Sequence, residues 1–217
     1  MYSQGLASDL GARPVADAPV DPFHPIGVRM PFDPGEEIFA QDEPSDLVYR
    51  VVAGAVRTSR LLSDGRRQIG DFYYQDDIFG LEPGSRHRFT AEALIDSDIL
   101  VVKHATLKRY GDEGLERLIW AATARELARA QEHLLLLGRK TACEKVASFL
   151  LDLAERDHGE TTTLPMGRQD MADYLGLTIE TVSRMLTQLQ AEGLVEFFGN
   201  RRFRIRRQAS LAKLVVG

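Results

Sequence analysis

Residues 168–193 constrain the fold of this chain more than any other segment, because they predict two short helices joined by a tight turn. Ala172 lies on the first predicted helix, where only a small side chain lets a second helix cross closely. Gly176 supplies the left-handed backbone conformation of the turn, and Val182 fills the space between the helices. The buried face is completed by Met171, Leu175, Leu177, Met185 and Leu189. The segment predicts a helix-turn-helix, with a purely structural helical hairpin as the alternative.

The second predicted helix begins with a polar turn, for which Thr178 is the expected N-cap. Arg184 has the geometry to bind guanine, Glu180 can accept a hydrogen bond from cytosine, and Ser183 can bind a base edge or a phosphate. The first residues of a recognition helix point into the major groove of double-stranded DNA. An exposed ion pair between Glu180 and Arg184 is the alternative. The expected base contacts are Ile179, Glu180, Ser183 and Arg184.

Basic residues gather at the C-terminal end, although the whole chain has a net charge of −5. Residues 139–217 hold 12 Lys and Arg against 10 Asp and Glu, so residues 1–138 hold 15 against 22. The runs "LVEFF" and "RRFRIRR", around Gly199 and Asn200, predict a β-hairpin, a wing after the second helix. Its arginines are candidates for phosphate contacts or simply solvated. The expected DNA-backbone contacts are Arg168, Thr178, Thr181, Arg201, Arg202 and Arg206, with Arg204 and Arg207 as further candidates.

The chain before residue 139 divides into three predicted parts. Residues 1–25 are rich in Pro, Ala, Gly and Asp without an apolar period, which predicts a flexible arm. Residues 26–114 contain short alternating apolar runs broken by turn signals such as "SDGRR", which favours a small antiparallel barrel or sandwich. The fold class is therefore α+β: an antiparallel β-domain, a long helix over 115–138 and a winged helix-turn-helix domain over 139–217.

The predicted helix over 115–138 carries a seam with the three-and-four spacing of a coiled coil. Packing on its own domain is one interpretation of this helix. We favour a homodimer, because so long a helix between two domains has little of its own chain to bury against, and the segment "LGRKT" after it predicts a hinge. The expected dimer interface contains Trp120, Leu127, Ala130 and Leu134, and the seam also includes Thr123 and Leu137.

With these motifs in hand, the chain resembles the CRP/FNR superfamily of bacterial transcription regulators over residues 26–210. The segments "GRKTACEKVASFLL", "LPMGRQDMADYLGLTIETVSR" and "HRFTAEAL" are similar to its FixK branch. The resemblance implies that the β-domain is a β-roll of the cupin-like or cyclic-nucleotide-binding type. It also implies an activator that works with RNA polymerase, and that Glu180, Ser183 and Arg184 read the TTGAT half-site of a palindrome, with Ile179 at a variable place.

The sequence also departs from the sensors found in that superfamily. Gly80 is followed by Leu81, and "SRHRF" replaces the Arg-Ser pair that holds a cyclic nucleotide. Cys143 is the single cysteine, so no N-terminal cysteine cluster can hold iron and sulfur; we expect a small core residue there, with redox control as the alternative. The five histidines, His24, His87, His104, His133 and His158, show no metal spacing, although one could bind a haem.

We therefore expect a homodimeric, sequence-specific DNA-binding activator of low-oxygen genes, without a bound cofactor or metal; the low-oxygen role rests on the resemblance alone. The rival is a regulator gated by a small molecule, such as a cyclic nucleotide or haem, in the β-roll. An enzyme is not expected, because no nucleophile–base pair, carboxylate pair or phosphate loop is visible. No apolar run is long enough for a membrane span and no signal-peptide pattern is visible, so a cytoplasmic location is expected.

Overall fold

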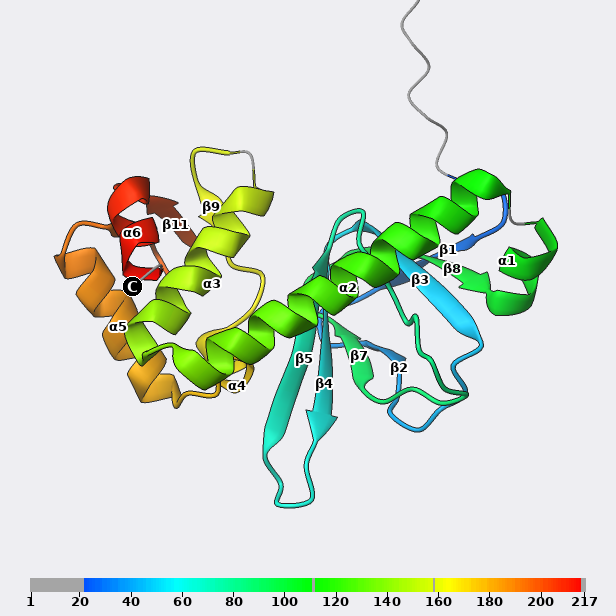
Figure 1. The fold of residues 1–217 in the computed structure, drawn as a ribbon, viewed down its shortest axis with the longest axis horizontal. Coiled ribbons are helices and arrows are strands. Elements are labelled where there is room, and N and C mark those ends of the chain that lie inside the picture. Colours follow the sequence, from blue (N-terminus) through cyan, green and yellow to red (C-terminus); the bar gives the residue numbers. More distant parts are fainter. Residues whose placement is uncertain (1–21, 111, 158, 216–217) are drawn as a thin grey trace, which may run out of the picture.

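The computed structural model describes residues 22–110, 112–157 and 159–215 (Figure 1). Residues 1–21, most of the predicted flexible arm, lie outside the described residues. The end of that prediction needs correction, because residues 22–26 form a turn in which Phe23 is fully buried. Phe23 packs in one apolar cluster with Leu115 and Ala122, so the folded domain begins before residue 26.

The N-terminal domain is a β-roll of two four-stranded antiparallel sheets, which confirms the predicted fold class. Side chains between the sheets, such as Tyr49, Val51, Phe79 and Ile99, form its main apolar core, since strands point alternate residues inward. One sheet has the order β1 (Val28–Phe32), β8 (Ser97–Lys103), β3 (Leu47–Ala53), β6 (Ile78–Phe79). The other has the order β2 (Glu37–Phe39), β7 (Thr90–Ala93), β4 (Ala55–Leu61), β5 (Arg67–Tyr74).

Two helices follow the β-roll: α1 (His104–Tyr110), which was not predicted, and the long α2 (Glu113–Arg139). Asp112 caps α2, its carboxylate accepting a hydrogen bond from the Leu115 backbone at 2.8 Å. The predicted long helix is thus confirmed, with two more residues at its start and one more at its end. α2 lies along the roll and continues to the C-terminal domain (Figure 1).

The C-terminal domain contains α3 (Ala142–Arg156), the helix pair α4 (Arg168–Leu175) and α5 (Ile179–Ala191), and α6 (Gln208–Val215). Its sheet has the order β10 (Val195–Phe198), β11 (Arg202–Ile205), β9 (Thr162–Thr163). Gly176 closes the turn between α4 and α5 with φ +61°, and Ala172 and Val182 are fully buried where the helices cross. The predicted winged helix-turn-helix is confirmed.

Two elements of this domain carry no prediction. β9 is two residues long and extends the wing to three strands. α6 follows the arginine-rich strand, and its Leu211 is fully buried in the core of the domain. The spacing of Leu211 and Leu214 along one helical face is the signal that would have indicated α6.

Candidate nucleic-acid interface

The first turn of α5 is exposed to solvent on one side. The Thr178 hydroxyl accepts a hydrogen bond from the Thr181 backbone N–H at 3.3 Å, so the predicted N-cap is present. Behind this turn, Val182, Met185 and Leu186 are buried against the domain core. Ile179, Glu180 and Arg184 are exposed, whereas Thr181 and Ser183 are half-buried. The buried face therefore orients the polar turn toward solvent.

Glu180 and Arg184, both among the described residues, form no ion pair with each other in the structure. Hydrogen bonds from its own backbone N–H and from the Thr178 hydroxyl lower the pKa of the Glu180 carboxyl. An ionised carboxylate at this position is an acceptor only, which suits the amino group of cytosine. The alternative interpretation of these two residues as a paired couple has no support from this geometry.

Ser183 brings α4 and α5 together at their exposed ends. The Arg168 guanidinium, at the first residue of α4, donates a hydrogen bond to the Ser183 hydroxyl over 3.3 Å. One predicted phosphate contact and one predicted base contact therefore lie within hydrogen-bond distance of each other. Thr181, another predicted backbone contact, lies beside Thr178, with 3.2 Å between their hydroxyl oxygens.

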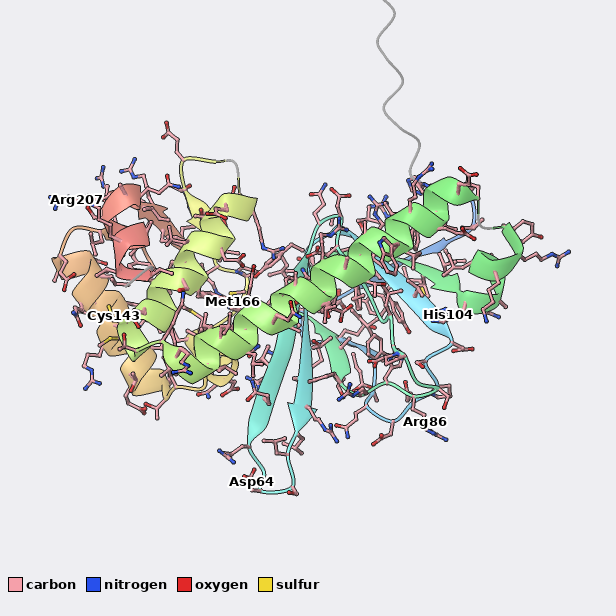
Figure 2. The ribbon with its side chains drawn as sticks, in the orientation of Figure 1. Asp64, Arg86, His104, Cys143, Met166 and Arg207 are labelled. Carbon is pink, nitrogen blue, oxygen red and sulfur yellow. The ribbon has the colours of Figure 1, made fainter. Side chains whose placement is uncertain are left out.

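The wing arginines differ in the contacts that they make within the protein. Arg201 donates to the Pro165 carbonyl at 2.6 Å, which ties the wing loop to the segment before α4. Arg202 donates to the Thr161 hydroxyl at 3.3 Å. Arg204 and Arg206 pair with Glu196 at 2.9 and 2.8 Å, and the Arg204 hydrogen bond is the main cause of the lowered pKa of Glu196. Arg207 lies at the outer end of the domain (Figure 2).

Arg204 is therefore the weakest phosphate candidate of the wing. It is half-buried, and its guanidinium carbon lies 5.5 Å from the centroid of the Phe198 ring. Arg201, Arg202 and Arg206 are exposed and keep guanidinium surface toward solvent. Among these three, Arg201 lies near the Arg168 end of α4, because it contacts Pro165, three residues before that helix begins.

A stripe of apolar side chains lies uncovered along α2. Trp120, Leu127 and Leu134 are 76%, 61% and 71% exposed, and Ala130 is exposed between them. A contiguous exposed apolar surface of this kind marks an interaction site in a folded protein. Leu137 departs from the predicted seam: it is half-buried, and a Cβ at Gly176 would lie 3.3 Å from its Cδ2 atom.

A cavity of about 420 Å³ lies between the roll and α2. Thr123, Leu127 and Ala130 line it from α2, opposite Glu82 and Arg88 of the roll. The Glu82 carboxylate accepts a hydrogen bond from the Arg88 backbone N–H at 3.3 Å. The cavity thus borders the exposed stripe of α2.

The candidate sensor residues are not arranged as a metal site in the described part of the chain. His87 is buried and stacked on Phe39 with 3.7 Å between ring centroids, and burial lowers its pKa. His133 stacks on Tyr174 at 4.0 Å, and His158 lies outside the described residues. Cys143 is half-buried near the start of α3, where burial raises the pKa of its thiol (Figure 2).

A winged helix-turn-helix joined to a β-roll by a long helix defines a DNA-binding transcription regulator. Residues 144–214 match the family of Crp-like helix-turn-helix domains, and residues 29–113 match the family of cyclic nucleotide-binding domains. The chain belongs to the CRP/FNR family of transcription regulators, which are not enzymes, and FixK proteins are among its most similar relatives.

Three relatives support this assignment. The nitrogen fixation regulation protein FixK of Azorhizobium caulinodans is 45% identical over 98% of this chain and 87% of its own length. FixK of Rhizobium meliloti is 45% identical over 84% of this chain and 85% of its own length. The structure of FixK2 from Bradyrhizobium japonicum matches with a TM-score of 0.83 and 48% identity, covering 87% of this chain and 97% of that chain.

Each helix among the described residues is too short or too polar to cross a membrane.

Proposed function

We propose that this chain is a homodimeric activator that binds an inverted repeat of TTGAT-type half-sites. The exposed first turn of α5 carries the proposal, because Glu180 and Arg184 present an acceptor and a donor fork from the N-terminal end of a recognition helix. Arg168, Thr178, Thr181 and the exposed wing arginines would hold the DNA backbone around them. In this assignment Ile179, Glu180, Ser183 and Arg184 contact the bases.

The uncovered stripe of α2 supports the homodimer. The described part of the chain leaves its apolar side chains exposed, and two copies packed along Trp120, Leu127, Ala130 and Leu134 would bury them. Two recognition helices related by a two-fold axis meet successive major grooves about 34 Å apart, which requires an inverted repeat.

Similarity to named relatives supports the proposed physiological role. Two of the relatives are named regulators of nitrogen fixation, and a third, from Rhodopseudomonas palustris, is named a transcriptional activatory protein and is 41% identical over 80% of this chain and 75% of its own length. We extend this to activation of low-oxygen genes in the cytoplasm, through contact with RNA polymerase and without a bound cofactor.

Fluorescence anisotropy with three duplexes tests the proposal: an inverted repeat of TTGAT half-sites, a single half-site, and a scrambled sequence. We expect the ligand-free protein to bind the inverted repeat most tightly, as one dimer per duplex. Sedimentation of the same protein should give a dimer at micromolar concentration. Equal binding to the repeat and the scrambled duplex would contradict the proposed sequence recognition.

The cavity beside the stripe favours one alternative, a regulator gated by a small molecule. Glu82 and Arg88 offer charged groups to a ligand there, and the α2 residues that line the cavity also border the proposed dimer interface. Titrating cyclic nucleotides or haem into the purified protein distinguishes the two functions. A monomer that dimerises and binds DNA only with one of these ligands would favour the alternative.

A further inference from the structure

Two arginines of the β-roll form ion pairs with α4, the first helix of the helix-turn-helix. Arg57 of β4 pairs with Asp170 at 2.9 Å, and Arg67 of β5 pairs with Asp170 at 2.6 Å and with Asp173 at 2.7 Å. Arg57 also pairs with Glu92 of the roll at 3.1 Å. The Asp170 side chain is only 9% exposed, so this cluster is largely withdrawn from water.

An apolar contact lies beside this ionic cluster. Ile69 and Phe72 of β5 are buried in the same core as the helices of the C-terminal domain. The Phe72 ring lies 5.2 Å from the Tyr174 ring of α4 and 6.0 Å from the Phe149 ring of α3. The two domains therefore share a continuous core at this junction rather than touching at their surfaces.

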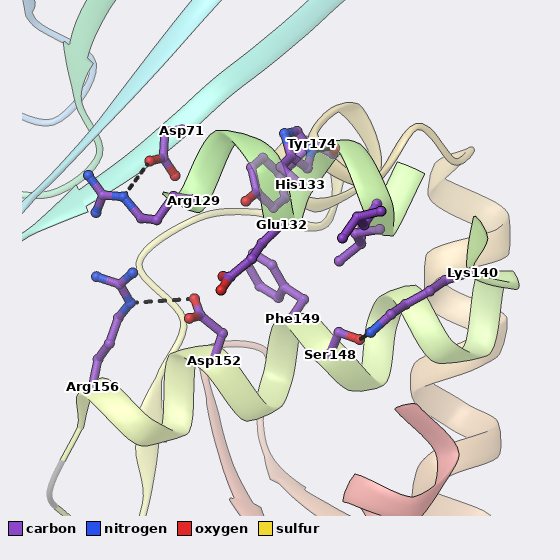
Figure 3. A pocket seen from close by; sticks show the side chains of 12 residues that line it. Asp71, Arg129, Glu132, His133, Lys140, Ser148, Phe149, Asp152, Arg156 and Tyr174 are labelled. Carbon is purple, nitrogen blue, oxygen red and sulfur yellow. Dashed lines mark hydrogen bonds and ion pairs between the residues drawn. The ribbon is translucent and has the colours of Figure 1, made fainter. Parts of the chain in front are cut away.

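A second chain of ion pairs lies at the junction with α2 and α3. Arg129 of α2 pairs with Asp71 at 3.0 Å and with Asp77 at 3.2 Å. Asp77 also pairs with Arg156 of α3 at 3.4 Å, and Arg156 pairs in turn with Asp152. Figure 3 shows the Asp71–Arg129 and Asp152–Arg156 pairs on the wall of a cavity of about 290 Å³. Loss of one pair therefore leaves other contacts that hold the domains together.

Fixing α4 also fixes α5. The two helices cross at Ala172 and Val182, both fully buried, and Gly176 sets the turn between them. Among the described residues, the β-roll makes ionic contacts with α4 and with α3 but not with α5. The exposed side chains of α5 therefore stay available, while the direction of α5 is set by the contacts of α4. Direction matters in a dimer, because two recognition helices must meet two grooves at one fixed separation.

We infer that Arg57 and Arg67 are positioning residues for DNA binding, which hold the recognition helix at the angle that selects the spacing between half-sites. This inference rests on the proposed function. Removing one member of a largely buried ionic cluster leaves the other charges uncompensated, so the hold on α4 weakens. Affinity for a correctly spaced repeat falls, while contact with a single half-site persists.

The test compares the wild type with Arg67→Asp on inverted repeats whose spacers differ by one base pair, and on a single half-site duplex. We expect the wild type to prefer one spacer. Arg67→Asp should lose roughly ten-fold or more in affinity on that spacer and show a flattened spacer preference, with half-site affinity and dimer sedimentation unchanged.

Two further variants keep the test specific. Asp173→Arg added to Arg67→Asp reverses the pair and should restore the spacer preference. Arg66→Asp is the matched control: its side chain is 78% exposed near the hairpin tip and pairs with Asp64, not with α4, so DNA binding should not change. If Arg67→Asp does not fold, Arg67→Gln removes the pair without adding a charge, and the same flattening is expected.

Other outcomes separate the inference from the function beneath it. A wild type that binds no inverted repeat overturns the proposed function and this inference with it. A wild type with a spacer optimum that Arg67→Asp leaves unchanged overturns the inference alone. Tighter binding by Arg67→Asp on every spacer also overturns it, because the roll would then hold α5 away from DNA.

Discussion

Some of the side chains at the start of α5 already form hydrogen bonds within the free protein, and others do not. Ser183 accepts a hydrogen bond from Arg168, and the Glu180 carboxylate accepts from its own backbone and Thr178. The exposed Arg184 side chain makes no hydrogen bond or ion pair with the other described residues. Replacing Arg184 should therefore remove the proposed DNA contact without breaking a contact with the other described residues.

Arg184→Ala should abolish the preference for the TTGAT-type repeat, at a cost of about 1–3 kcal/mol per bidentate base contact. Arg206→Ala should weaken binding to all sequences alike, because a phosphate contact carries no sequence information. It should also reduce the slope of log affinity against log salt concentration by about one, because one phosphate contact is lost. Gel shifts on matched and scrambled duplexes at several salt concentrations separate the two effects. Equal loss on both duplexes for Arg184→Ala would refute its role as a base contact.

Cys143 should react slowly with thiol reagents, because it is half-buried and burial raises the pKa of its thiol, so little thiolate is present at neutral pH. Cys143→Ser should leave DNA binding unchanged with or without peroxide. The measurement is the rate of labelling in the folded protein against that in urea. Rapid labelling together with peroxide-sensitive binding that Cys143→Ser removes would show redox control.

At the scale of elements, α2 carries the prediction about assembly. Replacing Leu127 and Leu134 with Glu should raise the dimer dissociation constant by roughly a hundred-fold or more, since two like charges would face each other in a buried seam. Binding to the inverted repeat should fall in parallel. Sedimentation and anisotropy on the same samples measure both.

Leu135→Glu is the control for this change. Leu135 is 62% exposed and adjacent to Leu134, but it lies outside the predicted seam. Its substitution should leave the dimer intact. A dimer that survives the Leu127 and Leu134 substitutions would place the interface elsewhere.

How well an element could be predicted depended on how much of its signal is local. α2, α4 and α5 have strong periods and clear boundaries, such as Gly176 at a turn that needs positive φ. α6 and β9 are short, and α6 is stabilised by burial of Leu211 against a core made of distant residues. The exposed start of α5 was predicted because its N-cap and polar side chains lie in one short segment.

At the scale of the whole molecule, the pairs between the roll and α4 were not predictable. Arg57 and Asp170 are 113 residues apart, and neither belongs to a motif that indicates a partner. Burial of Ile69 and Phe72 in the C-terminal core likewise depends on the angle between the domains. The sequence did indicate each domain, because the core of each is made largely of its own periodic segments.

The junction also predicts a pH dependence of stability. Burial is the main cause that raises the pKa of Asp71 to about 6, from an ordinary value near 3.8. The folded protein thus holds this proton more tightly than the unfolded chain, so its contribution is fully present below about pH 4 and is lost as the pH rises through 6.

Relative to Asp71→Asn, the wild type should lose about 1 kcal/mol of stability between pH 5 and pH 7.5. Urea denaturation of both proteins at the two pH values measures the difference, in which the titration of other groups largely cancels. A difference that grows in the opposite direction would mean that the ion pair with Arg129 outweighs the burial of the carboxyl.

The β-roll forms its ion pairs with α4 rather than with α5, and this affects how the DNA targets of such regulators can change in evolution. Exchanging the side chains proposed to face DNA would leave this attachment intact, so a duplicated gene could acquire a new target sequence through a few substitutions. A new distance between half-sites demands matched changes in the roll and in α4. Among descendants of this chain, the base sequence of the half-sites should therefore vary more readily than the distance between the two half-sites.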